Sequence, residues 1–344
     1  MPWSKEFGQE KRAEGAMTRW GESGTFFGKL RGRGIPVIDR SFGDQRLARM
    51  QDAALQGGAE RWAAVRAPLA AARGPEDLTF LVEGLQEVSG VERWTADVLA
   101  EHPDDTLALL VSGARHAGWA WQARGESLAS GVPASQWNLF QERLKVAEEQ
   151  LLEVAEREPD WAAPWYFLLA CGRGTQVGPE VAESRFEEVC RRAPGHVAAH
   201  SQRLQQLCKK WGGSHEQMFA FAREAARRAP DGSGLGQLVA TAHLEVWADS
   251  GGGENSTVLR DPAVVRELHA AAALSVHHPA FVRERDWAVG VNTFAMAFAL
   301  AGEDAAARVM FRSVGKRVTR TPWRYLNAQS PVAPFLLWRD RVGG

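Results

Sequence analysis

The chain has 344 residues, of which 45% are apolar and 24% are charged, and its formal net charge is −1. This composition is typical of a soluble folded protein, and the near-zero net charge excludes a chain-wide electrostatic attraction to nucleic acid. The length is sufficient for two ordinary domains or for one elongated array of repeats.

The number of cysteines and the hydropathy of the sequence indicate the cellular compartment expected for the protein. The three cysteines, at positions 171, 190 and 208, are odd in number and widely spaced, so we expect no disulfide framework. The sequence has no run of about 18 apolar residues and no apolar core near its first residues, so neither a spanning helix nor a signal peptide is expected. A reducing cytoplasm is therefore the predicted location.

Residues 1–45 are rich in glycine and charge and show no sustained periodicity, which predicts a flexible or partly ordered segment. Within it, Lys29, Arg31 and Arg33 alternate with glycines, a pattern that can follow a phosphate backbone. Nearby acidic residues dilute this charge and favour an incidental origin for it.

The sequence predicts an α-helical repeat domain over residues 46–344. Apolar residues recur at helical spacing, and glycine or proline ends each run. The first five predicted helices carry these apolar stripes: Leu47, Met50 and Ala54; Trp62, Val65 and Leu69; Leu78, Leu81, Val82 and Leu85; Trp94, Val98 and Leu99; and Leu107, Leu110, Val111, Ala114 and Trp121. No stretch alternates with period two for long enough to predict a sheet.

Residues 124–136 form a polar, glycine- and proline-containing loop before the next predicted helix, which carries Leu144, Ala147, Leu151 and Val154. Long insertions in repeat arrays often touch ligands, but they are also tolerated without function. Both interpretations of this loop remain open.

One short pattern repeats three times: Arg-Glu-Pro-Asp at 157–160, Arg-Ala-Pro-Gly at 192–195 and Arg-Ala-Pro-Asp at 228–231. The prolines are separated by 35 and 36 residues, and an amphipathic run lies on each side of them. Proline ends one helix and suits the first turn of the next, while arginine near a helix C-terminus complements the macrodipole. The period predicts repeated helix–turn–helix units.

These units resemble the tetratricopeptide repeat family, most clearly over residues 137–249. With Pro194 as a closing proline, the small and aromatic positions of the family's second helix fall on Ala182 and Phe186, and an apolar first-helix position falls on Tyr166. The family's first-helix tyrosine is replaced by Arg173. The segment 210–214 also resembles uncharacterised actinobacterial repeat proteins. The resemblance implies an all-α fold, a right-handed α-solenoid of antiparallel helix pairs, with divergent N- and C-terminal units.

The C-terminal units and cap are expected over 261–344, after a glycine-rich linker at 250–257. Helices are predicted after Asp261, over 281–300, and after a turn at 301–304 that again resembles a tetratricopeptide unit. The segment 322–342 is expected to form the apolar cap of the stack and carries large apolar residues that include Trp323, Leu326, Phe335, Leu336 and Trp338.

Motifs for chemistry are not found. His196 and His200 are four residues apart and would share a helix face, but no third ligand lies within a turn, so a packing role is favoured over a metal site. His277 and His278 are adjacent and would point apart. The glycine-rich stretches lack the Lys-Ser/Thr of a phosphate loop. We therefore expect no catalytic residues, no metal, no cofactor and no enzymatic activity.

The resemblance also implies which residues bind a partner. In the family, the first helix of each pair lines the concave face of the array. Transferring those positions to this sequence gives the following candidates: Ser201, Gln202, Gln205, Lys209, Gln237, Thr241, Glu245, Arg283, Asp286 and Trp287. The clamp with which some members hold a C-terminal carboxylate does not match here.

The favoured function is a cytoplasmic scaffold for protein–protein interaction that binds a peptide or protein segment. One alternative is a nucleic-acid-associated regulator that uses the basic C-terminal region, where eight cations accompany a single acid: Arg308, Arg312, Lys316, Arg317, Arg320, Arg324, Arg339 and Arg341. A solvated helix face also explains that charge. A third possibility is a small-ligand pocket or enzyme, which would require converging titratable groups. No membrane partner is expected.

Overall fold

A computed structural model describes residues 36–125, 132–254 and 256–343. Within these ranges the chain forms α-helices and short 3-10 turns and no strand. The all-α class predicted from the sequence is confirmed for this part of the chain. The predicted N-terminal segment lies outside the described residues up to position 35, as do residues 126–131 of the predicted loop.

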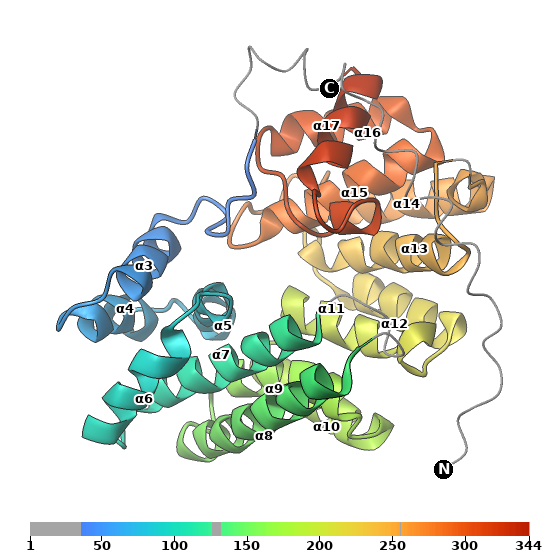
Figure 1. Cartoon of the computed structure of the whole chain (residues 1–344). Coiled ribbons are helices and arrows are strands. Elements are labelled where there is room, and N and C mark those ends of the chain that lie inside the picture. The colour runs from blue at the N-terminus through green and yellow to red at the C-terminus, as the bar shows by residue number, and fades with distance from the viewer. Residues whose placement is uncertain (1–35, 126–131, 255, 344) are drawn as a thin grey trace. The chain divides into compact units, whose positions relative to one another are not determined.

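The helices follow one another along the chain (Figure 1). The α-helices are α3 (Gln45–Gln56), α4 (Arg61–Ala70), α5 (Pro75–Gln86), α6 (Val91–Glu101), α7 (Thr106–Arg124), α8 (Ala134–Arg157), α9 (Ala163–Thr175), α10 (Pro179–Arg192), α11 (Val197–Gln206), α12 (His215–Arg228), α13 (Gln237–Asp249), α14 (Pro262–Leu274), α15 (Trp287–Ala301), α16 (Asp304–Val314) and α17 (Val332–Arg341). The 3-10 turns are η3 (Lys209–Trp211), η4 (Gly234–Gly236), η5 (Val258–Arg260) and η6 (Trp323–Tyr325).

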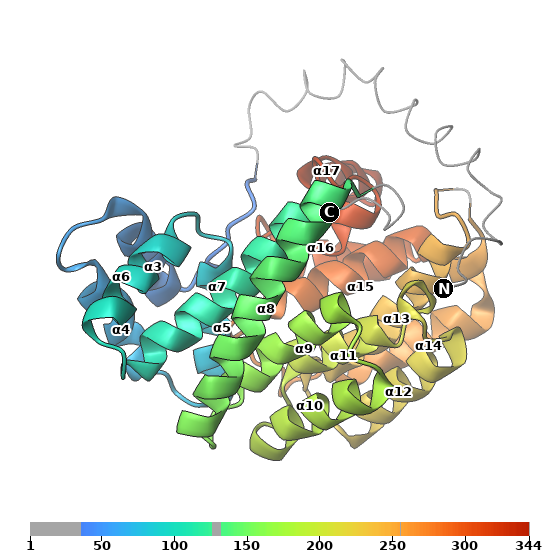
Figure 2. The ribbon, with the colours of Figure 1, turned by 60° about the horizontal axis from the view of Figure 1, so that its bottom comes forward.

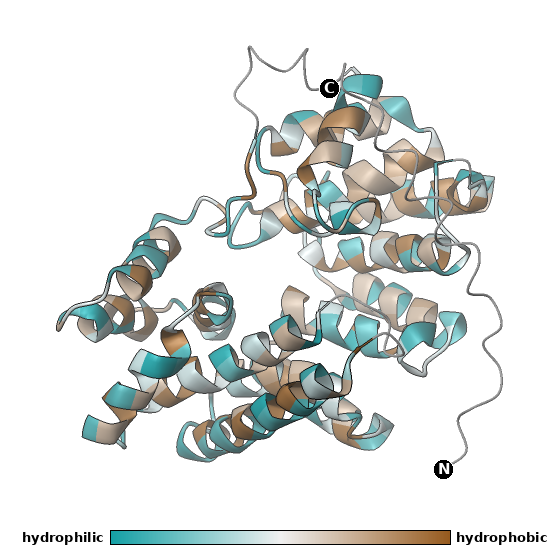
Figure 3. Cartoon of the chain, viewed as in Figure 1, coloured by the Kyte–Doolittle hydropathy of each residue, from teal (hydrophilic) through white to brown (hydrophobic). Residues whose placement is uncertain are grey.

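Several helices begin at residues whose chemistry favours a helix start. Asp44 and Asp105 accept hydrogen bonds from backbone N–H groups at the starts of α3 and α7, and Pro75 and Pro179 occupy the first turns of their helices. Most helices carry both hydrophobic and hydrophilic residues (Figure 3), as expected when one face is buried.

The helix predicted over 281–300 begins six residues later, at Trp287. Arg285 has φ of 53°, a left-handed conformation that a continuous helix cannot accommodate. Its side chain is held by Glu76, far away in the sequence. This tertiary contact keeps residues 281–286 in an irregular segment.

The chain divides into two compact units. Unit 2 consists of Asp39–Ala242 and Ala271–Trp287, and unit 1 includes His243–Ala270 and the helices from Ala288 on. The chain therefore leaves unit 2 within α13, returns to it within α14, and leaves it again at the start of α15.

In unit 2, α9 is the central helix. It packs against α5, α7, α8, α10 and α11, and nine of its thirteen residues are buried. The long helices α7 and α8 lie side by side in both views (Figures 1 and 2). Close packing requires glycine at Gly174, where a Cβ atom would lie 2.5 Å from Leu144 Cδ1.

In unit 1, α15 is almost entirely buried, from Ala288 to Ala301. Trp323 is fully buried and contacts Phe311 and Phe335 with ring centroids 5.7 and 5.5 Å apart. The indole Nε1 of Trp323 donates a 2.7 Å hydrogen bond to Asn292 Oδ1. The apolar C-terminal segment thus packs against α15 and α16, although Leu326 is only half-buried.

No helix in the described residues is both long enough and apolar enough to cross a membrane. None of the three cysteines, all of which are described residues, forms a disulfide, and burial raises the pKa of Cys171 to about 12.

Candidate functional site

A cluster of polar side chains lies around α9 in unit 2. Glu76 and Glu83 are seven residues apart on α5 and share a face of that helix. Tyr166 is on α9, Gln202 is on α11, and Arg285 with Asp286 is on the irregular segment before α15. We call the group formed by Glu76, Glu83, Tyr166, His196, Gln202, Arg285 and Asp286 the α9 cluster.

Tyr166 is the centre of this cluster. It is 2% exposed, and its hydroxyl donates a hydrogen bond to Glu83 Oε1. Its pKa is raised far above the ordinary value, first by burial and then by the charge of Glu83, while a hydrogen bond with Gln202 acts in the opposite direction. Tyr166 therefore remains a neutral hydrogen-bond donor at any physiological pH.

Glu83 and Asp286 are two half-buried acids of the cluster. Burial is the main cause of a raised pKa for each carboxyl group. Burial and the negative charges of Asp286 and Glu87 raise the pKa of Glu83 to about 7, despite the opposing Tyr166 hydrogen bond.

Arg285 closes one side of the cluster. Its Nη2 lies 2.5 Å from Glu76 Oε2, and its Nη1 lies 3.4 Å from Glu284 Oε2. The guanidinium is thereby shared between two other carboxylates. Its charge lowers the pKa of Asp286, but burial outweighs this effect and the net change is upward.

His196 is the N-cap residue of α11, where its Nδ1 accepts a hydrogen bond from the backbone N–H of Ala199 at 3.3 Å. Its ring stacks on Tyr166, with centroids 5.4 Å apart and planes inclined by 13°. Burial, with the charges of His200 and Arg285, lowers the pKa of His196 to about 3, so the ring is neutral. Since Nδ1 is an acceptor, the proton is on Nε2, which is buried without a hydrogen-bond partner.

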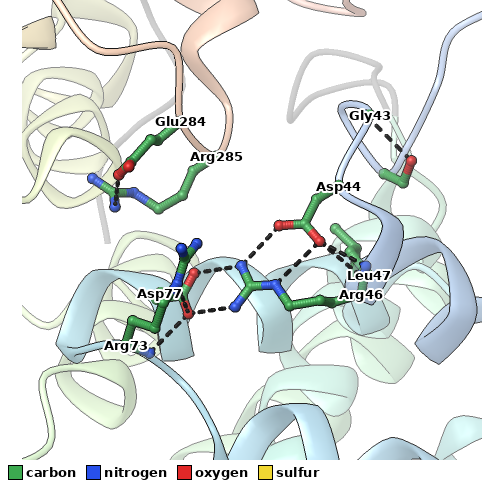
Figure 4. A network of polar contacts seen from close by, with 9 residues as sticks. Gly43, Asp44, Arg46, Leu47, Arg73, Asp77, Glu284 and Arg285 are labelled. Carbon is green, nitrogen blue, oxygen red and sulfur yellow. Dashed lines mark hydrogen bonds and ion pairs between the residues drawn. The ribbon is translucent and has the colours of Figure 1, made fainter.

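A second polar network in the same unit is structural. Arg46 donates to both carboxylate oxygens of Asp77 at 2.8 Å, and also to Asp44, the N-cap of α3 (Figure 4). Asp77 is 3% exposed. The hydrogen bonds from Arg46 hold the pKa of Asp77 at about 2, although burial acts against them. This network fastens α3 to α5, the helix that carries Glu83.

The ten partner-binding residues predicted from the sequence occupy different environments. Gln202 and Asp286 belong to the α9 cluster, and Gln202 Oε1 also accepts a 2.7 Å hydrogen bond from Arg173. Lys209 and Arg283 are exposed. Four others are half-buried: Ser201, Gln205, Thr241 and Trp287.

Two of the ten are buried in internal contacts. Gln237 is 7% exposed, and its carbonyl accepts a 2.9 Å hydrogen bond from the Thr241 hydroxyl. Glu245, in unit 1, is 6% exposed and accepts a hydrogen bond from the hydroxyl of Tyr325. Arg283 and Asp286 were predicted on a helix, but they lie in the irregular segment before α15.

Sequence reasoning missed the contribution of Glu83, Tyr166 and Arg285. A signal for Glu83 was present, because it is a charged residue that directly follows the apolar residues Leu81 and Val82. Tyr166 was predicted only as a packing residue. Nothing in the sequence indicated that Arg285 and Glu76, 209 positions apart, would meet.

Chemically, the α9 cluster combines two carboxyl groups with raised pKa values, a neutral phenol and a neutral imidazole. Such an arrangement can accept hydrogen bonds from a ligand and can exchange a proton near neutral pH. Comparison of the chain with models of protein families, with curated proteins and with solved structures gave no match.

Proposed function

We propose that this protein is a helical-repeat scaffold that binds a peptide or protein segment, and that the α9 cluster is part of its binding surface. One observation carries the proposal. Gln202 and Asp286, which the tetratricopeptide resemblance assigns to the partner-binding face, come from separate segments and both act on the pKa of Tyr166, Gln202 by hydrogen bonding and Asp286 by its charge. In this proposal the helix pairs stack as a right-handed α-solenoid, and the three free thiols fit a reducing cytoplasm.

The two acids with raised pKa values also favour a second candidate, a small polar ligand in place of a peptide. Converging acids were the condition that the sequence analysis set for a ligand pocket, and Glu83 and Asp286 meet it. The basic C-terminal region gives less support to nucleic-acid binding. Arg341 pairs with Glu254 at 2.8 Å, and Arg308 donates to the carbonyl of Val342 at 2.6 Å.

A peptide-binding function can be tested by selecting ligands from a random peptide library displayed on phage. Dissociation constants of the selected peptides are then measured by calorimetry with the wild-type protein and with the Gln202→Ala/Asp286→Asn variant. The matched control is Glu149→Gln, because Glu149 is an exposed acid on α8 of the same unit.

The proposal expects affinity to fall at least about tenfold in the double variant, because lost hydrogen bonds to charged groups cost about 1.5–3 kcal/mol each. The control should bind as the wild type does. Failure to select any peptide, or equal binding by the double variant, would overturn the assignment.

A further inference from the structure

Two tryptophans and two arginines meet near the C-terminal ends of α7 and α9. Trp121 and Arg124 are on α7, Arg173 is on α9 and Trp211 is on η3, all within unit 2. The two indole rings pack edge to face, with centroids 5.8 Å apart and planes inclined by 86°. We call these four residues the tryptophan–arginine cluster.

Both arginines contact the same two rings. The Cζ atom of Arg124 lies 5.7 Å from the centroid of Trp121 and 5.6 Å from that of Trp211. The Cζ atom of Arg173 lies 4.8 and 5.3 Å from the same two centroids. Cation–π contacts hold a guanidinium in place through its charge, but they do not satisfy its N–H donors. Two like charges are thus fixed against one pair of rings.

Arg124 pairs with no acid among the described residues. Its Nη1 donates a long hydrogen bond of 3.3 Å to the carbonyl of Gly125 at the protein surface. Its pKa is lowered with burial as the only cause, so no carboxylate charge offsets its own. By contrast, Arg157, which ends α8 as Arg124 ends α7, pairs with Glu153. A partly buried cation without a counter-ion is costly, and a bound anion would compensate it.

The surroundings of the cluster are polar or positively charged. Arg173 donates a 2.7 Å hydrogen bond to the neutral acceptor Gln202 Oε1. Lys209 and Lys210 are exposed and directly precede Trp211 in η3. All four residues of the cluster are half-buried, so the cluster retains accessible surface. It therefore presents positive charge to the solvent.

We propose that Arg124 and Arg173 bind the phosphate group of a phosphate monoester, while Trp121 and Trp211 hold the two guanidiniums in place. A phosphate monoester has close to two negative charges near neutral pH and three terminal oxygens, which guanidinium groups bind with paired N–H donors. Its charge matches the two cations, whereas a carboxylate has one charge. This site contains no residue of the α9 cluster, and it goes beyond the proposed function because it requires no peptide.

Three probes separate charge from shape. Methyl phosphate and methyl sulfate are both small tetrahedral esters, but at about pH 8 the first has nearly two negative charges and the second has one. N-acetyl-phosphoserine-N-methylamide presents the phosphate on a peptide unit. Binding of each probe to the intact chain is measured by calorimetry. The variants are Arg124→Gln and Arg124→Lys, and the control is Arg93→Gln, because Arg93 is in the same unit with its side chain 86% exposed.

Methyl phosphate should bind saturably, and methyl sulfate should bind at least about tenfold more weakly. Arg124→Gln should weaken the binding of methyl phosphate at least about tenfold, since charge-assisted hydrogen bonds are roughly twice as strong as neutral ones. Arg124→Lys should be intermediate, because lysine keeps the charge but lacks the planar fork of donors. Arg93→Gln should match the wild type. Circular dichroism confirms that each variant is folded.

No saturable binding of methyl phosphate, equal binding of the two esters, or equal affinities of Arg124→Gln and Arg93→Gln would overturn the proposal. The comparison of the two esters on the wild-type protein decides even where a variant unfolds. Binding of the phosphoserine probe more tightly than methyl phosphate would uphold the site and identify a phosphorylated peptide as its ligand. Equal or weaker binding of that probe would uphold the site for a free phosphate ester. Peptides displayed on phage carry no phosphate, so the peptide selection and this experiment can fail separately.

Discussion

The Tyr166 hydroxyl on α9 donates a hydrogen bond to Glu83 on α5, joining positions 83 residues apart in the sequence. The chain contains only two tyrosines, and the other, Tyr325, donates to Glu245 in the same manner. Each compact unit therefore contains one tyrosine whose hydroxyl donates a hydrogen bond to a glutamate. In unit 2 it keeps a half-buried acid in place beside a second acid, Asp286, and this makes Glu83 the most informative position for mutation.

Replacement of Glu83 by glutamine should stabilise the protein at alkaline pH. The pKa of Glu83 is raised from 4.5 to about 7, mainly by burial, so the folded state binds more protons than the unfolded state between these values. The free energy of unfolding should therefore fall as pH rises through this window, and Glu83→Gln should be more stable by about 1–3 kcal/mol near pH 8 and nearly neutral near pH 4.5. Urea unfolding across pH measures this.

Two further variants test whether Glu83 causes the pH dependence of stability. Tyr166→Phe removes the donor to Glu83 and should destabilise the protein most above about pH 7, where the carboxylate is ionised. Glu149→Gln, at an exposed position, should leave the pH profile unchanged. Parallel profiles for the wild type and Glu83→Gln would show that Glu83 titrates normally.

Removal of Arg46 should destabilise unit 2 by about 2–4 kcal/mol at neutral pH, because it leaves the buried carboxylate of Asp77 without its main partner. The pKa of Asp77 is lowered from 3.8 to about 2, so this contribution is complete above pH 3.8 and is lost as pH falls through about 2. Thermal unfolding of Arg46→Ala measures the loss.

The control for Arg46→Ala is Arg73→Ala. Arg73 lies 3.8 Å from Asp77 with its side chain 69% exposed, so its loss should cost less than about 1 kcal/mol. Equal effects of the two substitutions would contradict the assignment of Arg46 as the principal partner.

Gly84→Ala should be destabilising although alanine is the better helix former. The added Cβ would lie 2.3 Å from Leu47 Cδ1, and Leu47 is fully buried between α3 and α5. Overpacking costs about 1–3 kcal/mol and the higher helix propensity of alanine returns about 1 kcal/mol, so we expect a net loss of up to about 2 kcal/mol. In a double-mutant cycle, Leu47→Ala should relieve the effect of Gly84→Ala, and strictly additive losses would count against a direct clash.

Asn292→Ala should destabilise unit 1 by about 2–4 kcal/mol. Its side chain is fully buried, accepts from Trp323 Nε1 and donates to the carbonyls of Ala288 and Arg317 at 2.8 and 2.9 Å. The substitution leaves several buried groups unpaired at once. Urea unfolding followed by tryptophan fluorescence measures the effect. The same change at Asn138, an exposed position on α8, should cost less than about 0.5 kcal/mol.

Local signals in the sequence were sufficient to predict most helices. Asp44, Asp105 and Pro75 act at helix starts as their chemistry requires, and most residues of the apolar stripes are buried. The predicted start of α15 was wrong because Arg285 has a left-handed backbone conformation and its side chain contacts Glu76. No local sequence pattern encodes that contact.

The candidate site was less predictable than the helices for the same reason. Gln202 and Asp286 were named from repeat register, but Glu83 and Tyr166 became functional candidates only when α5 and α9 were seen together. A pKa is a property of three-dimensional surroundings. Periodicity indicates which face of a helix is buried and does not indicate which charges that face will meet.

The return of residues 271–287 to unit 2 has a consequence for biosynthesis. During translation, α5, α9 and α11 leave the ribosome long before the segment that carries Arg285 and Asp286. A nascent chain can therefore form the contact between Tyr166 and Glu83 before Arg285 and Asp286 have been synthesised. The complete α9 cluster forms only after the ribosome has passed position 286, and a fragment ended at Ala242 would lack part of it however well its helices formed.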